Sequence, residues 1–377
     1  MSLQGQTPFA IAFPDEQLSL LSRKLALITL PDEIDDANWD YGVPLTDIKR
    51  LVDRWKNGFD WRKQETAFNA ELPQFTRGID VEGYGTLNIH YVHKKSEVKG
   101  AIPLLFVHGW PGSFIEVRKL LPLLVEASPD HPSFHVVAIS LPGYGFSSAP
   151  SKKGFEIAQY AEVAHKLMLA LGYDEYVTQG GDWGYMVTRK IAELYGPKHS
   201  KAWHTNCPVS GPPTIGRPLV WLGHALSALP LLSYNKREKA GLERSAWFQR
   251  WGSGYLAEQT TRPQTLGHSL ADSPVGLLAW IYEKLVEWTD NYKWEDDEGR
   301  TISFTFKNSN SLVLASPHLD FHILVLTRRA SNISVHEEGG HFAAYEKPDV
   351  LAGDLKKMFG KGGRAFGVVK GKNGYDA

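Results

Sequence analysis

The chain has 377 residues, 42% of them hydrophobic, and its 41 basic and 42 acidic side chains leave a net charge of −1. A chain of this length can bury a large core, and its balanced charge gives no reason to expect nucleic acid or an anionic membrane as a partner. Its single cysteine, Cys207, excludes an intrachain disulfide and fits a reducing compartment.

The start of the chain and its apolar stretches predict a cytoplasmic protein. The first six residues, MSLQGQ, lack the basic and then apolar pattern of a signal peptide. No run of about 18 apolar residues occurs, so no membrane span is expected.

The first ~80 residues are predicted to be helical, within an N-terminal segment placed at residues 1–85. Apolar residues recur at helical spacing after Pro14 and again from about Thr46. Aromatic-rich pieces that fit no regular spacing separate these helices, and they indicate a segment that wraps around another domain.

Strands alternate with helices over residues 86–211. Strands are predicted at 86–92, 102–107, 134–139, 176–180 and 202–205, and helices at 155–171 and 185–194. Strand, crossover helix and parallel strand form the unit of a doubly wound sheet, so we expect an α/β fold with a mostly parallel sheet.

A helical lid is predicted over residues 212–310, which are rich in Pro, Trp and Leu. An insertion there would cover the carboxyl edge of the sheet, where α/β proteins bind ligands. Its tryptophans are either ordinary packing residues or the wall of an apolar substrate cavity. Residues 311–377 are expected to return to the core, and the glycine-rich tail after Phe359 is expected to fray.

The sequence GGDWG at 180–184 lies between a predicted strand and a predicted helix. A nucleophile elbow needs small residues on both sides because its sharp turn brings backbone segments close together. A glycine-flanked aspartate is by itself more often a simple turn. The position after a strand favours Asp182 as a nucleophile that attacks carbon and forms an ester.

Two further glycine-bounded segments complete the candidate site. HGWPG at 108–112 lies at the end of a predicted strand. We expect the backbone N–H groups of Trp110 and Trp183 to form an oxyanion hole, although a tight turn at the strand end fits equally well. GGHF at 339–342 contains His341, and a late histidine is expected to activate water against an ester. Nucleophile first and histidine last is the order of α/β-hydrolases.

These segments resemble the microsomal-type epoxide hydrolases, most of all the soluble fungal members. The resemblance covers about residues 8–294 and 336–350. It rests on WDYGVP (39–44), DWR (60–62), PQFT (73–76), HGWPGS (108–113), LPGYGFS (141–147), GDWG (181–184), GY (254–255), DSPVGL (272–277) and GHFAAYEKP (340–348). It implies an α/β-hydrolase core with an N-terminal wrapping segment and a helical lid. The activity that it implies requires no cofactor or metal.

The resemblance also implies the roles of the site residues. Asp182 would open the epoxide, His341 would direct the hydrolytic water, and Tyr255 matches the first of two lid tyrosines that donate a proton to the epoxide oxygen. Taken alone, Tyr255 is equally a buried aromatic anchor. A small apolar epoxide and water are the expected partners, and a homodimer is left open.

The chain departs from the family pattern at about residues 295–335. No tyrosine occurs between Tyr292 and Tyr345, so the second lid tyrosine is not assigned. A histidine base needs a carboxylate on its other ring nitrogen. Asp320 is the preferred candidate because it follows an apolar run, and Glu337 and Glu338 are the alternatives.

Two other functions remain open from the sequence. One is a catalytically impaired or inactive homologue that binds epoxide-like ligands, because one tyrosine is missing and the acid is uncertain. The other is a haloalkane dehalogenase, which also uses an aspartate nucleophile and needs N–H donors such as those of tryptophan around the halide.

Overall fold

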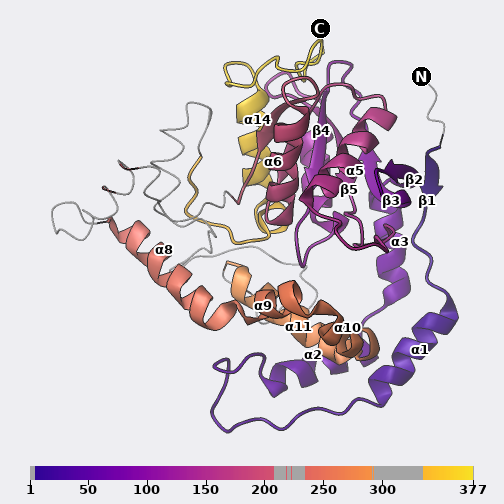
Figure 1. Ribbon diagram of the computed structural model, residues 1–377, viewed down its shortest axis with the longest axis vertical. Helices are drawn as coiled ribbons and strands as arrows, with labels where there is room; N and C mark the ends of the chain where they lie inside the picture. The colour runs from indigo at the N-terminus through magenta and orange to yellow at the C-terminus, as the bar shows by residue number, and fades with distance from the viewer. Residues whose placement is uncertain are drawn as a thin grey trace. The chain divides into compact units, whose positions relative to one another are not determined.

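The computed structural model describes residues 5–207, 218, 222, 234–290, 292 and 334–376 (Figure 1). The chain divides into two compact units. Unit 1 comprises Met1–Ala10, Phe68–Tyr234 and Val313–Ala377, and unit 2 comprises Ile11–Ala67 and Asn235–Leu312. The segment boundaries expected at 85, 211 and 310 stay predictions.

A single sheet forms the centre of unit 1. Among the described residues it has seven strands in the order β1-β2-β3-β5-β4-β6-β7. Strands β1, β2, β3 and β5 pair antiparallel, whereas β5, β4, β6 and β7 pair parallel. The bounds are β1 Thr7–Phe9, β2 Gln74–Val81, β3 Gly85–Lys94, β4 Ile102–Val107, β5 Phe134–Ile139, β6 Tyr176–Gly180 and β7 Ser200–His204.

The strands predicted at 102–107, 134–139 and 176–180 are confirmed residue for residue. Every residue of β4 is buried, as a continuous apolar run in a central parallel strand requires. The expectation that the first 80 residues are helical is wrong for β1 and β2. Strand β2 carries Arg77, Gly78 and Asp80, and pairing with β3 along its whole length, rather than its own pattern, makes it a strand.

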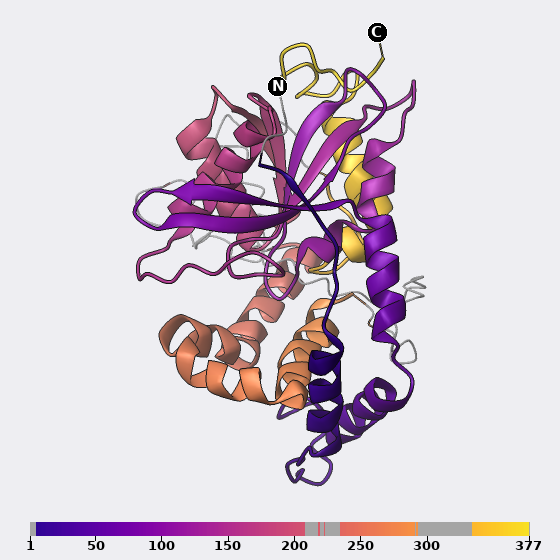
Figure 2. The ribbon, with the colours of Figure 1, turned by 90° about the vertical axis from the view of Figure 1, so that its right-hand side faces the viewer.

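Helices cover both faces of this sheet (Figure 2). Helices α5 and α6 pack against each other on one face, and α4 and α14 pack against each other on the other face. The bounds in unit 1 are η1 Phe114–Val117, α4 Leu120–Val125, α5 Ile157–Ala170, α6 Trp183–Tyr195, α13 Ala343–Glu346 and α14 Pro348–Phe359. A sheet with its parallel strands between two helical layers confirms the predicted α/β class.

The expectation of a frayed tail is wrong. The carbonyl of Gly374 accepts from the Ser133 amide at 2.7 Å, and its own amide donates to the Gly100 carbonyl at 2.8 Å. Val369 and Tyr375 are buried. The tail is rich in glycine because it turns tightly, and its backbone pairs with the segments that precede β4 and β5.

Unit 2 is helical. Its small core joins Leu25 of α1, Ile48 and Val52 of α2, and Val275 of α11. The bounds are α1 Asp15–Ala26, α2 Leu45–Asn57, α8 Lys236–Trp247, the π-helix η3 Phe248–Gly252, α9 Gly254–Thr261, α10 Pro263–Asp272 and α11 Pro274–Trp288. Helix α3, Trp61–Glu71, begins in unit 2 and ends in unit 1.

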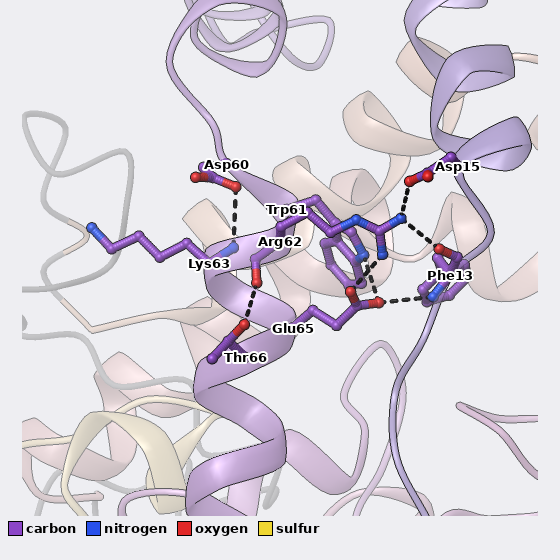
Figure 3. Close-up of polar contacts among 8 residues, drawn as sticks. All are labelled: Phe13, Asp15, Asp60, Trp61, Arg62, Lys63, Glu65 and Thr66. Carbon is purple, nitrogen blue, oxygen red and sulfur yellow. Dashed lines mark hydrogen bonds and ion pairs between the residues drawn. The ribbon is translucent and has the colours of Figure 1, made fainter.

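A polar network joins the start of α3 to the segment before α1 (Figure 3). The Glu65 carboxylate accepts from the Phe13 amide at 2.8 Å and from Arg62 at 2.6 Å. Arg62 also donates to the Phe13 carbonyl at 2.8 Å and pairs with Asp15. These bonds, that of the Phe13 amide first, lower the pKa of the Glu65 carboxyl. The DWR sequence at 60–62 therefore has a structural role in this network.

Candidate active site

The carboxyl ends of β4 and β6 lie next to each other because Val107 pairs with Gly180. The loop after β4 and the turn after β6 therefore meet at one edge of the sheet. Asp182 occupies that turn as the residue before α6, with φ +53° and ψ −124°. A positive φ is strained for a residue with a side chain, by ~1–3 kcal/mol, and such strain is typical of functional turns. Asp182 thus has the backbone of a nucleophile elbow.

Two glycines leave the room that this turn needs. A Cβ atom on Gly184 would collide with the Val107 carbonyl, and one on Gly109 would collide with the Asp182 carboxylate. The first contact lets α6 start directly against β4. The second lets the backbone after β4 approach the nucleophile itself.

The backbone of that loop binds the nucleophile. The Trp110 amide donates to Oδ1 of Asp182 at 2.8 Å. Trp183 is the first residue of α6, so its N–H is among those with no acceptor inside the helix. The structure places the Trp110 amide at the carboxylate, and Trp183 follows Asp182 in the chain; the oxyanion hole itself stays a prediction.

His341 lies against the same carboxylate. Its Nε2 is 3.8 Å from Oδ2 of Asp182, and its side chain is 6% exposed. Burial lowers the pKa of His341, and the charge of Asp182 and a hydrogen bond with the Trp110 backbone oppose this effect in part. A lowered pKa keeps the imidazole neutral near pH 7, the form in which it accepts a proton.

Glu116 is a site residue that the sequence analysis missed. It lies in η1, and burial raises its pKa to about 8, with the negative charge of Asp182 adding to the effect. Glu116 is therefore protonated at neutral pH. It is hard to recognise in the sequence because it reads as one more helical glutamate after the glycine turn.

These groups surround a small cavity. It has about 10 Å³ of space, enough for about one water molecule. Asp182, His341 and Glu116 line it together with Gln179 and Asn206, which are hydrogen-bonded to each other at 2.8 Å. All of these residues belong to unit 1. A polar site of this size beside a carboxylate and a neutral imidazole suits a reacting water.

Tyr255 lies in unit 2, near the start of α9. Its ring centroid is 5.2 Å from that of Trp288 and 6.4 Å from that of Phe248, and the Lys284 ammonium lies 4.5 Å above it. Aromatic rings and a cation therefore orient the phenol within this unit. Asp320 lies outside the described residues.

Comparison with known proteins decides the family. The chain is 35% identical to a putative epoxide hydrolase of Stigmatella aurantiaca over 94% of its own length and 85% of that protein. It is 33% identical to epoxide hydrolase 1 of Sus scrofa, covering 94% and 88% of the two chains. The chain belongs to the epoxide hydrolase family.

Other comparisons of this epoxide hydrolase agree in fold. Residues 6–117 match the epoxide hydrolase N terminus family and residues 102–266 match the alpha/beta hydrolase fold family. The structure of Aspergillus niger epoxide hydrolase superposes with a TM-score of 0.70 at 30% identity, over 93% of this chain and 94% of that one. The predicted family and the α/β-hydrolase fold are thus confirmed.

Within residues 5–207, 234–290 and 334–376, none of the helices has the length and apolar composition to span a bilayer. The same part of the chain contains no group of three or more His, Cys, Asp or Glu side chains arranged to hold a metal ion.

Proposed function

We propose that this enzyme converts an epoxide to a vicinal diol through an ester on Asp182. The observation that carries the proposal is the arrangement around one carboxylate. Oδ1 accepts from the Trp110 amide at 2.8 Å, and Oδ2 lies 3.8 Å from the His341 imidazole. The two oxygens thus have different surroundings, which suit different tasks.

In the first step, Oδ2 of Asp182 attacks an epoxide carbon. A C–O bond forms to the carboxylate, the ring C–O bond breaks, and its electron pair moves to the ring oxygen. Tyr255 donates its phenolic proton to that oxygen, because a leaving alkoxide is too basic to depart unassisted. The role of Tyr255 rests on the family resemblance and on the proton that a phenol can donate.

In the second step, water attacks the ester carbonyl carbon of Asp182. His341 takes one proton of the water, and the negative charge of the tetrahedral intermediate develops on Oδ1. The Trp110 amide already donates to that oxygen, and the Trp183 amide is the proposed second donor. Collapse of the intermediate expels the diol oxygen, which takes the proton from His341 and leaves Asp182 as a carboxylic acid. The remaining proton returns through water to the Tyr255 phenolate, which restores both the Asp182 carboxylate and the Tyr255 phenol.

Asp320 is the proposed carboxylate partner of His341. A carboxylate on the second ring nitrogen would fix the tautomer and stabilise the imidazolium that forms in the second step. The proposed role of Asp320 rests on its place in the sequence alone.

The experiment that tests the function measures diol formation from a panel of aryl and alkyl epoxides. Asp182→Ala should lower kcat/KM by roughly 10⁴-fold or more, as removal of a covalent nucleophile does. Asp174→Ala is the matched control, because that exposed aspartate lies just before β6 and has no proposed role.

A single turnover in ¹⁸O-water tests the ester itself. Water attacks the carbonyl of Asp182, so the label should enter the Asp182 carboxylate and not the diol. Label in the diol after one turnover would rule out the ester. Chloride released from a chloroalkane, without diol from any epoxide, would favour the dehalogenase, and tight epoxide binding without turnover would favour the inactive homologue.

A further inference from the structure

Glu346 is a buried carboxylate that the two proposed steps do not use. Its side chain is 4% exposed. Oε2 accepts from the Gly340 amide at 3.0 Å, and Oε1 accepts from the Phe342 amide at 2.8 Å. The two donors are the residues immediately before and after His341. One carboxylate therefore holds the backbone on both sides of the histidine.

The backbone before His341 needs such a restraint. Two glycines precede the histidine, and Gly339 has φ +117°, a conformation that residues with side chains rarely adopt. Glycine has more backbone freedom than other residues, so these positions do not fix where the imidazole lies. Two charge-assisted hydrogen bonds to neighbouring amides restrict that freedom, and such bonds are stronger than neutral ones.

A second carboxylate in the same loop offers a contrast. Glu338 pairs with Lys347 at 2.6 Å, but the Glu338 side chain is 40% exposed. Exposed ion pairs contribute little because water and salt screen them. Both carboxylates thus form their bonds within residues 338–347, but only the carboxylate of Glu346 bonds to the amides next to His341.

We infer that Glu346 is a positioning residue for ester hydrolysis, holding His341 at the distance from Asp182 that lets it direct the water. This inference rests on the proposed function. Because His341 acts only on the ester, Glu346 should affect the second step and leave ring opening unchanged.

The test compares Glu346→Gln with Asp349→Asn, the same change from carboxylate to amide at an exposed position three residues later. In Glu346→Gln the ester-hydrolysis rate constant should fall roughly 10–100-fold, because displacing a reacting group by about 1 Å costs up to ~10²-fold. The rate of ester formation in a single turnover should stay within about threefold. kcat and KM should then fall together with kcat/KM unchanged, and the ester on Asp182 should accumulate in intact-mass spectra. Asp349→Asn should leave both rate constants within about twofold, because exposed substitutions away from the site have small effects.

Hydrogen exchange gives a readout that does not depend on activity. Amides in a peptide spanning residues 336–347 should exchange faster in Glu346→Gln than in Asp349→Asn. Equal loss of both half-reactions with a lower melting temperature would mean a purely structural role and would overturn the inference, as would unchanged hydrolysis. A wild-type enzyme that forms neither ester nor diol would instead refute the proposed function, and the exchange comparison would still decide whether Glu346 restrains the loop.

Discussion

The surroundings of Asp182 and those of Tyr255 are built from different interactions. In unit 1, Asp182 is held by the Trp110 amide at 2.8 Å, and His341 is flanked by two amides that bond to Glu346. In unit 2, Tyr255 is surrounded by aromatic rings and by the ammonium group of Lys284. Directional hydrogen bonds thus position Asp182 and His341, whereas packing against aromatic rings and a cation positions Tyr255.

The difference follows from what each group is proposed to do. Ester formation and hydrolysis move charge between defined oxygen atoms, and fixed amide dipoles stabilise such charge best when their position is set in advance. A phenol that protonates epoxides of different shapes needs an apolar wall and a single polar tip. We therefore expect changes in unit 1 to alter single chemical steps, and changes around Tyr255 to alter ring opening.

The largest effect expected from this comparison is that of His341→Gln. Without a base, ester hydrolysis should slow by about 10²–10⁴-fold, whereas ring opening continues because a carboxylate nucleophile attacks without the help of a base. Nearly all of the protein should then carry the substrate mass after one turnover, which intact-mass spectrometry measures directly.

His336→Gln is the control for that substitution. His336 lies five positions earlier in the chain and pairs with Asp354 at 2.8 Å, so its loss should leave hydrolysis unchanged. Asp320→Asn should trap the ester less completely than His341→Gln. Diol release at the wild-type rate by Asp320→Asn would remove Asp320 as the partner, and rapid release by His341→Gln would remove the histidine as the base.

Tyr255→Phe should have the next largest effect, and on the other step. Ring opening should fall by about 10²-fold because the epoxide oxygen loses its proton donor, and rapid-quench kinetics of ester formation measure this directly. Tyr282→Phe, also in unit 2, is the control. Its hydroxyl contacts Asp47 at 3.3 Å and Arg50 at 3.4 Å, so its loss should cost about 1 kcal/mol of stability and leave kcat unchanged.

An unchanged rate of ring opening in Tyr255→Phe would break the comparison, because the aromatic surroundings would then serve packing alone. A slower hydrolysis step in that variant would break it in another way, since the two regions would no longer act on separate steps.

The smallest effect concerns pH. Burial lowers the pKa of His341, so its neutral form persists as pH falls and kcat should decline only below about pH 6.5, the ordinary value for histidine. In the ester Asp182 carries no charge, so it no longer raises the pKa of His341. Because kcat/KM reports ring opening, in which His341 takes no part, this acid limb should appear in kcat and not in kcat/KM.

Glu116 is the other titrating group of the cavity, with its pKa raised to about 8 by burial. The pH profile of Glu116→Gln separates the two groups, because a limb that survives the substitution belongs to His341. An acid limb of kcat clearly above pH 6.5 in both proteins would contradict a neutral, buried base.

Much of the fold and part of the site were predictable from the sequence. Strands β4 and β5 are largely apolar runs and β6 is a short run that ends in glycine, and the bounds of all three agree with the prediction. The glycines around Asp182 and the late His341 indicated an elbow and a base, and the structure brings both to one cavity. Four features were not predicted: strand β2, the packed tail, Glu116 and Glu346. The first three depend on partners elsewhere in the chain, and Glu346 depends on hydrogen bonds that its side chain accepts across a turn.

By itself the sequence determined the local requirements of this protein, which are apolar strands, glycines where backbones approach, and a nucleophile between a strand and a helix. Only the tertiary structure decided which groups meet. The pairing of β4 with β6 puts the Trp110 amide on Asp182, and burial sets the protonation of His341 and Glu116. Hydrogen bonding and desolvation depend on distances in space, and the spacing of residues along a chain does not determine those distances.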